Sequence, residues 1–124
     1  MPSTYCFAFS NIEMSVRYGS CNTNSHNAIS CYVHMGLERA KKHSDILAVQ
    51  RAHMRVIYTL IDTMCDHCVT KVWRKECYRY IKRLLPLLYE MLDPQQYKKK
   101  TKEIKTLHTY YFKDKQVKYQ LPNT

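Results

Sequence analysis

The sequence predicts an α+β domain that is mainly helical, with a central amphipathic helical hairpin flanked by short β elements near both ends. Apolar residues recur at three- and four-residue steps across residues 57–92, which indicates helices with one apolar face. Apolar and polar residues alternate near both ends, which is typical of half-buried strands. With 124 residues and 45% apolar content, the chain can build one modest core. We predict one compact domain over residues 1–96 and a basic extension over 97–124 that packs on it or trails from it.

The amino-terminal segment Tyr5–Tyr18 is predicted to form a β-hairpin. Phe7 and Phe9 alternate with smaller side chains before the dipeptide Ser10-Asn11, which would form the turn. A second alternating set follows the turn and consists of Ile12, Met14, Val16 and Tyr18. The next segment, Gly19–Ser30, is rich in serine and asparagine and is expected to be a loop.

Two consecutive segments of the middle third have helical spacing. Ser44, followed by Asp45 in the first turn, is a suitable N-cap for the first helix. The apolar stripe of this helix consists of Ile57, Leu60, Ile61, Met64 and Cys68. Burial in an ordinary core is the expected role of this stripe and of the stripe that follows.

The second helical segment covers Val69–Leu92. Its stripe consists of Val69, Val72, Trp73, Cys77, Tyr80, Ile81, Leu84, Leu88, Met91 and Leu92. Pro86 is expected to kink this helix or to end its first part. The pair Asp93-Pro94 should close it, because the residue before a proline avoids the helical conformation.

The last part of the chain is basic and rich in tyrosine. Gln95–His108 is predicted to be a short polar helix, and Tyr110–Leu121 alternates again and is predicted to be β. Tyr110 and Tyr111 stand among lysines, as on surfaces that bind single-stranded nucleic acid. An edge strand explains the same composition, since tyrosine favours strands and lysine opposes aggregation.

The charge of the chain is strongly positive and unevenly distributed. The net charge is +10. Residues 1–34 are neutral, residues 35–96 carry 11 basic and 7 acidic side chains, and residues 97–124 carry 8 lysines against 2 acids. Such an excess favours nucleic acid, an anionic membrane surface or an acidic protein as a partner.

A row of basic residues follows the polar side of the second predicted helix. It consists of Lys71, Arg74, Lys75, Arg79, Lys82 and Arg83. Steps of three and four residues place these cations on one ridge that can span several phosphates. We expect the surface to be extended by Lys98, Lys99, Lys100, Tyr110 and Tyr111. The alternative is a basic face that serves only solubility.

Cysteine and histidine pairs suggest a structural zinc site. Cys65 and Cys68 form a C-x₂-C knuckle at the junction of the two helices, and Cys31 and His34 form a second pair upstream. These four residues are the predicted ligands, and zinc would tie the upstream loop to the knuckle. Cys77 is disfavoured because a helix over 69–77 would place it about 13 Å from the knuckle.

Two alternatives to this ligand set stay open. Cys21 and His26 could replace the upstream pair or help to form a second site. All six cysteines could instead be small core residues, because free cysteine is among the most buried residue types. His53 is disfavoured as a ligand for the same helical reason as Cys77.

No targeting or catalytic motif is found. The amino terminus has no signal-peptide pattern, and no apolar stretch reaches the roughly 18 residues of a membrane span. We therefore expect an intracellular protein, in the nucleus or cytoplasm, in which thiols stay reduced. Lys98–Lys102 could act as a nuclear-import signal. The chain has two glycines, Gly19 and Gly36, which excludes glycine-rich phosphate loops, and we expect no enzymatic activity.

The short, basic, glycine-poor format with cysteine and histidine resembles that of accessory regulatory proteins of small viruses. Cys65–Arg79, in which Trp73 and Tyr78-Arg79 follow the C-x₂-C pair, resembles with one gap the small non-capsid nuclear proteins of bocaparvoviruses. Their Arg/Ser-rich amino-terminal region has no counterpart here. The resemblance therefore supports a viral accessory role in a host nucleus and does not assign the family.

We predict a small, basic, non-enzymatic regulatory protein that binds RNA or single-stranded DNA in preference to duplex. The alternative is a protein-interaction adaptor that docks an acidic partner protein with the same helix face. A peripheral membrane protein ranks last, because the apolar stripe beside the basic ridge is wide enough to be taken up by a core.

Overall fold

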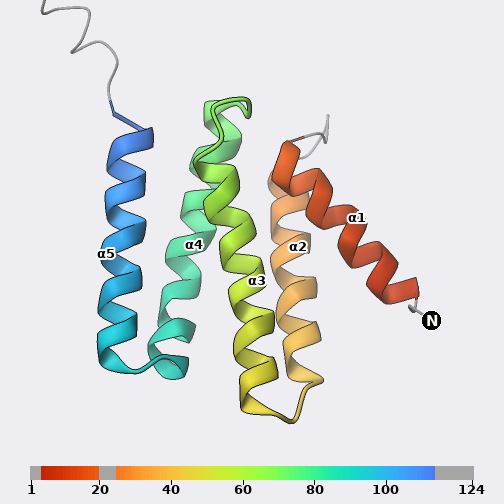
Figure 1. The fold of residues 1–124 in the computed structure, drawn as a ribbon. Helices are drawn as coiled ribbons and strands as arrows, with labels where there is room; N and C mark the ends of the chain where they lie inside the picture. The colour runs from red at the N-terminus through yellow and green to blue at the C-terminus, as the bar shows by residue number, and fades with distance from the viewer. Residues whose placement is uncertain (1–3, 20–24, 114–124) are drawn as a thin grey trace, which may run out of the picture.

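The computed structural model describes residues 4–19 and 25–113, and these residues form five α-helices and no β-strand. The helices are α1 (Thr4–Tyr18), α2 (Ser25–Lys41), α3 (Ile46–Met64), α4 (Lys71–Met91) and α5 (Pro94–Tyr111). Figure 1 shows α2 to α5 side by side, with α1 slanting along one edge and α5 at the opposite edge. The predicted α+β class is therefore wrong.

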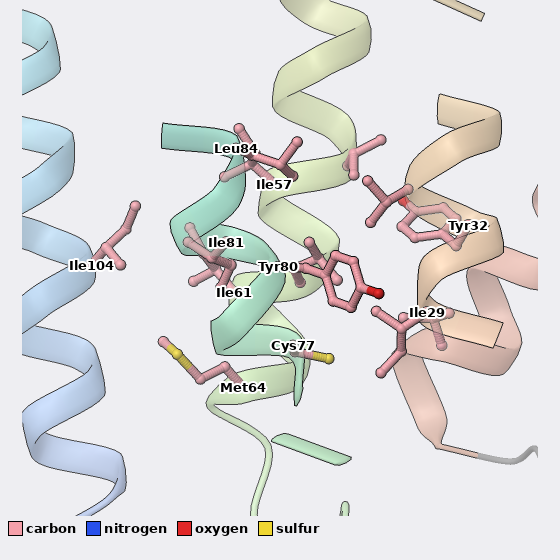
Figure 2. Close-up of a cluster of buried hydrophobic side chains, with 14 of the residues drawn as sticks. Ile29, Tyr32, Ile57, Ile61, Met64, Cys77, Tyr80, Ile81, Leu84 and Ile104 are labelled. Carbon is pink, nitrogen blue, oxygen red and sulfur yellow. The ribbon is translucent and has the colours of Figure 1, made fainter. Parts of the chain in front are cut away.

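The central helical hairpin is present as predicted. α3 and α4 pack against each other, and the knuckle Cys65–Cys68 lies in the turn between them. α2 covers one side of the pair and α5 the other. Figure 2 shows the resulting core, to which four helices contribute Ile29, Tyr32, Ile57, Ile61, Met64, Cys77, Tyr80, Ile81, Leu84 and Ile104.

Tyr5–Tyr18, predicted to be a hairpin, is the helix α1. Phe9 and Val16 are buried, and they lie seven residues apart on one helical face. Met14, which the alternating pattern would place beside Val16, is 61% exposed on the other face. The predicted loop over 19–30 is also too long, because α2 begins at Ser25.

The predicted carboxyl-terminal β element is wrong where the structure describes it. Tyr110 and Tyr111 belong to the last turn of α5, and Phe112 caps that helix. The rest of this prediction, residues 114–121, lies outside the described residues. The predicted boundary between residues 96 and 97 falls inside α5, and the division into two units stays a prediction.

Local signals set the helix ends, with two corrections. Asp45 rather than Ser44 is the N-cap of α3, and its carboxylate accepts a hydrogen bond from the Leu47 amide at 3.2 Å. Pro86 does not end α4, which continues to Met91.

Val72, predicted to be in the apolar stripe, is 75% exposed. Within the described ranges, none of the helices has the length and apolar character needed to cross a bilayer.

Candidate nucleic-acid interface

The exposed face of α4 carries five cations, which we call the α4 ridge: Lys71, Lys75, Arg79, Lys82 and Arg83. Trp73, Cys77 and Tyr80 are buried on the opposite side of the same helix. Because each residue turns the helix by about 100°, the five cations fall within one third of its circumference. Five of the six cations predicted to form the ridge therefore lie on one exposed face of α4, and their role in binding stays a prediction.

Arg74 does not belong to the ridge. Its side chain is buried, with 6% of the residue exposed. Its Nε donates a hydrogen bond to the Met64 carbonyl at 2.8 Å, and its Nη2 donates one to the Tyr111 carbonyl at 3.0 Å. Its guanidinium also lies 4.8 Å from the centre of the Phe112 ring. Arg74 therefore joins the carboxyl-terminal ends of α3 and α5 and is not available to a phosphate.

Aromatic rings and one carboxylate contact three of the five ridge cations. Arg83 lies 5.0 Å above the Tyr80 ring, and Lys82 lies 4.8 Å above the Tyr78 ring. Arg79 forms an ion pair with Glu76 at 2.7 Å. Because Arg79 is exposed, this pair is screened by water and contributes little to stability.

A second row of cations runs along α5. Lys98, Lys99, Lys102 and Lys105 are exposed, and we call them the α5 lysines. Lys100 points elsewhere: its ammonium donates to the Tyr58 hydroxyl at 3.2 Å and pairs with Glu103 at 2.8 Å. The predicted surface therefore loses Lys100. It gains Lys102 and Lys105, which the helical spacing of α5 could have revealed.

The outer face of α5 is hollowed near its carboxyl-terminal end. A shallow depression of about 500 Å³ is lined by Lys102, Lys105, Thr106, Thr109, Tyr110 and Lys113. Tyr110 is 68% exposed, so one face of its ring is open to a planar partner. Lysine ammonium groups and threonine hydroxyls can donate hydrogen bonds to phosphate oxygens. The tyrosine ring that they surround can stack on a base.

Tyr111 has a different environment from Tyr110. Its ring lies 5.2 Å from the His67 ring in the turn between α3 and α4, and its carbonyl accepts from Arg74. The Tyr110 and Tyr111 rings meet edge to face, with centres 4.9 Å apart. Tyr111 therefore packs against the turn between α3 and α4. Tyr110 is the tyrosine of the predicted pair that faces outward.

The α4 ridge and the α5 lysines adjoin at an aromatic seam. Tyr78 of α4 stacks on His108 of α5 with ring centres 3.7 Å apart. Burial, and next the charge of Lys82, lower the pKa of His108 below its ordinary value, so Lys82 borders this seam. Lys105 lies one helical turn before His108. The two sets of cations therefore form one surface across two helices, which we call the cationic surface.

The four predicted zinc ligands are spread over two regions. Cys31 and His34 are exposed on α2, Cys65 caps α3, and Cys68 is exposed in the following turn. Burial, and next the charge of Asp62, raise the pKa of the Cys65 thiol, which favours its protonated form. Zinc binds the thiolate and would itself lower this pKa, so the pKa of the metal-free thiol does not test the predicted site.

The carboxylate of Asp66 makes two hydrogen bonds at the knuckle. Asp66 accepts a hydrogen bond from the Cys68 amide at 2.9 Å and one from Arg17 at 2.7 Å. In the portion of the chain that the structure describes, no three Cys, His, Asp or Glu side chains are grouped to hold a metal ion. Cys21 lies outside that portion, as does the side chain of His26. The zinc site stays a prediction.

Cys77 is a core residue. It is fully buried, and burial raises the pKa of its thiol to about 12. It packs with Ile81 and Met64 in the same cluster (Figure 2). This environment agrees with the sequence-based expectation that Cys77 belongs to the apolar stripe.

The chain was compared with protein-family models, with curated proteins and with solved structures. No protein-family model matches it, and neither does a curated protein or a solved structure.

Proposed function

We propose that this protein binds nucleic acid, and RNA or single-stranded DNA in preference to duplex, through the cationic surface. The observation that carries the proposal is the continuity of this surface over α4 and α5. Five ridge cations and four α5 lysines are exposed there. A polyanion is the partner that can satisfy many such cations at once, because each phosphate contact releases a bound counterion.

The hollow on α5 supports the preference for single strands. Tyr110 offers an open aromatic face beside Lys105 and Lys113. An unpaired base can stack on such a ring while its phosphates meet the lysines, whereas the bases of a duplex are already stacked on each other. Stacking on one ring is worth about 1–3 kcal/mol.

The proposed role is regulatory and non-enzymatic, of the viral accessory type, in the nucleus or cytoplasm of a host cell. It rests on the charge, the size and the absence of catalytic motifs from the sequence. The groups that line the hollow on α5 are cations, hydroxyls and one aromatic ring, which suit the binding of a polyanion.

The first test is a salt titration of binding to fluorescent single-stranded RNA, followed by anisotropy. The double variant Arg79→Glu and Lys82→Glu removes two cations from the centre of the surface. Its affinity should be lower than that of the original chain. The slope of log K against log salt should fall by about 1.4, since each single-strand phosphate contact contributes about 0.7.

The matched control reverses Lys41 and Arg51 to glutamate. Both are exposed on α2 and α3, and the change in net charge is the same. This control should bind like the original chain, because its charges lie outside the cationic surface. Equal losses in both double variants would show that only total charge matters. Binding that does not depend on salt would overturn the proposal.

Tyr110 separates nucleic acid from an acidic protein partner. Tyr110→Ala should weaken binding of single strands about 5- to 150-fold, which corresponds to one lost stacking contact. Tyr110→Phe should keep this affinity, and duplex binding should change little in both variants. An affinity that is the same for long and short strands, together with tight stoichiometric binding of one acidic protein, would instead support the adaptor.

A further inference from the structure

The outer face of α1 carries an apolar stripe that none of the described helices covers. The stripe consists of Phe7, Met14 and Tyr18, which are 64%, 61% and 60% exposed, with Asn11 among them. We call these four residues the α1 stripe. Single exposed apolar residues are ordinary, but three large ones on one face of one helix mark an interaction surface.

The face around the α1 stripe carries no exposed charge among residues 7–18. The other exposed residues there are Ala8 and Ser10. The two charged residues of α1 are engaged with the helices and turn behind it. Glu13 accepts hydrogen bonds from Tyr32 at 2.6 Å and Arg55 at 2.7 Å, and Arg17 pairs with Asp66 at 2.7 Å.

The spacing of the α1 stripe is that of a helix that packs on another helix. Steps of four, three and four residues place Phe7 and Met14 at d positions and Asn11 and Tyr18 at a positions of a heptad. An asparagine at an a position is a recognised device for fixing the register and number of paired helices, because its amide finds its best partner in a second copy of itself.

The position of α1 also indicates which partner binds the α1 stripe. α1 lies at the edge of the molecule opposite to α5, which carries lysines (Figure 1). Two chains of net charge +10 repel each other strongly. They can meet with less repulsion at the uncharged face of α1, because the α5 lysines of each copy lie at the opposite edge of the molecule.

We propose that the α1 stripe is the interface through which two copies of this chain form a two-fold symmetric dimer. The two α1 helices pack against each other, and the Asn11 amide of each copy faces that of the other. An isologous contact of this kind uses the same patch twice and closes without forming a filament. The pairing does not depend on the proposed function, and it leaves both cationic surfaces open at the outer ends.

Sedimentation equilibrium of the purified chain, over a wide concentration range and at two salt concentrations, tests the proposal. The expected mass is that of two chains. Met14→Glu should raise the dimer dissociation constant at least about a hundredfold, because two carboxylates would be buried without partners. Met14 is exposed in the single chain, so the variant should fold, and circular dichroism checks this.

The control for a new surface charge is Val72→Glu. Val72 is as exposed as the stripe residues and lies on α4, so this variant should keep the mass of two chains. A single-chain mass at every concentration would overturn the proposal. A dimer that Met14→Glu leaves unchanged would overturn it as well, because another face would then form the contact.

Asn11 distinguishes a register-setting amide from a passive surface residue. Asn11→Leu should tighten association and admit higher oligomers, because the polar residue that limits register is gone. Asn11→Asp should weaken association severalfold at neutral pH, because two carboxylates would face each other. If neither variant changes the mass distribution, Asn11 is outside the interface and the proposed pairing is wrong.

Discussion

At the scale of single residues, Arg74 is the side chain whose role depends most on its surroundings. From within α4, its guanidinium donates hydrogen bonds to two carbonyls at the carboxyl-terminal ends of α3 and α5. A lysine could reach only one of these oxygens with similar geometry. The guanidinium therefore links three helices at one end of the hairpin.

Arg74→Met keeps the apolar stem and removes the donors, so the carbonyls of Met64 and Tyr111 lose a charged partner. We expect a loss of about 2–3 kcal/mol in the free energy of unfolding, measured by urea denaturation. The matched control, Arg79→Met on the exposed ridge, should change it by less than about 0.5 kcal/mol. A stable Arg74→Met variant with weakened nucleic-acid binding would place Arg74 in the interface after all.

Glu13 makes the fold sensitive to acid. Burial alone would raise the pKa of this carboxyl, but hydrogen bonds from Arg55 and Tyr32 outweigh it and hold the pKa below the ordinary value of 4.5. A lowered pKa means that ionised Glu13 stabilises the fold at neutral pH. This stabilisation is lost as the pH falls through the pKa of the folded protein.

Glu13→Gln should therefore be less stable than the original chain at pH 7. The two urea midpoints should converge as the pH falls below about 4.5 and through the lower pKa of Glu13 in the folded protein, where the original chain loses its charged contact. The exposed carboxylate Glu90 provides the control, and Glu90→Gln should follow the original curve. Parallel curves for Glu13→Gln and the original chain would show that the contact with Arg55 does not stabilise the fold.

At the scale of elements, the close approach of α2 to α3 depends on one glycine. A methyl group added at Gly36 would overlap the Val56 side chain, which is itself buried. Val56 is β-branched and has one favoured rotamer in a helix, so it cannot turn aside. The glycine therefore sets the distance between the two helices.

Gly36→Ala should destabilise the protein by about 1–3 kcal/mol, because the overlap outweighs the better helix propensity of alanine. The measurement is the urea midpoint. Val56→Ala should also be destabilising, because it leaves a cavity. The double variant should be more stable than the sum of the two single effects predicts, since the small side chain makes room for the added methyl group. Additive losses would show that the two positions do not compete for space.

α1 shows where periodicity failed as a guide. Its buried face consists of Phe9 and Val16, but its exposed face is also apolar, with Phe7, Met14 and Tyr18. A helix with apolar residues on two faces lacks the contrast that reveals a helical period, and alternate residues then imitate a strand. Only the packing of α1 against α2 and α3 shows which face is inside.

At the scale of the whole molecule, charge is separated along the row of helices. The uncharged outer face of α1 lies at one edge, and the α5 lysines lie at the other (Figure 1). A net charge of +10 on a small chain opposes compactness, because like charges are brought together on folding.

Added salt should therefore stabilise the protein. Raising sodium chloride from about 0.05 to 0.5 M shortens the screening length to a few ångströms, and we expect the melting temperature to rise by a few degrees. The variant with Arg79→Glu and Lys82→Glu should gain less, because each reversal removes two units of charge. A melting temperature that falls with salt would show that ion pairs such as Arg55 with Glu13 outweigh the repulsion.

The sequence by itself determined the two central helices, the turn between them and the basic face of the second. Long stripes at helical spacing, the acid at Asp45 and the pair Asp93-Pro94 are local signals, and local signals can be read without partners. The position of five ridge cations followed from the same spacing.

Only the tertiary structure decided which face of α1 is buried, that Arg74 bonds carbonyls of two other helices, and that α5 adjoins the ridge at Tyr78 and His108. Each of these depends on contacts between residues far apart in the chain. Periodicity reports where a side chain lies on its own helix. It does not report which residues of other helices lie next to that side chain. Those neighbours decide whether a cation such as Arg74 is exposed to a phosphate or hydrogen-bonded inside the protein.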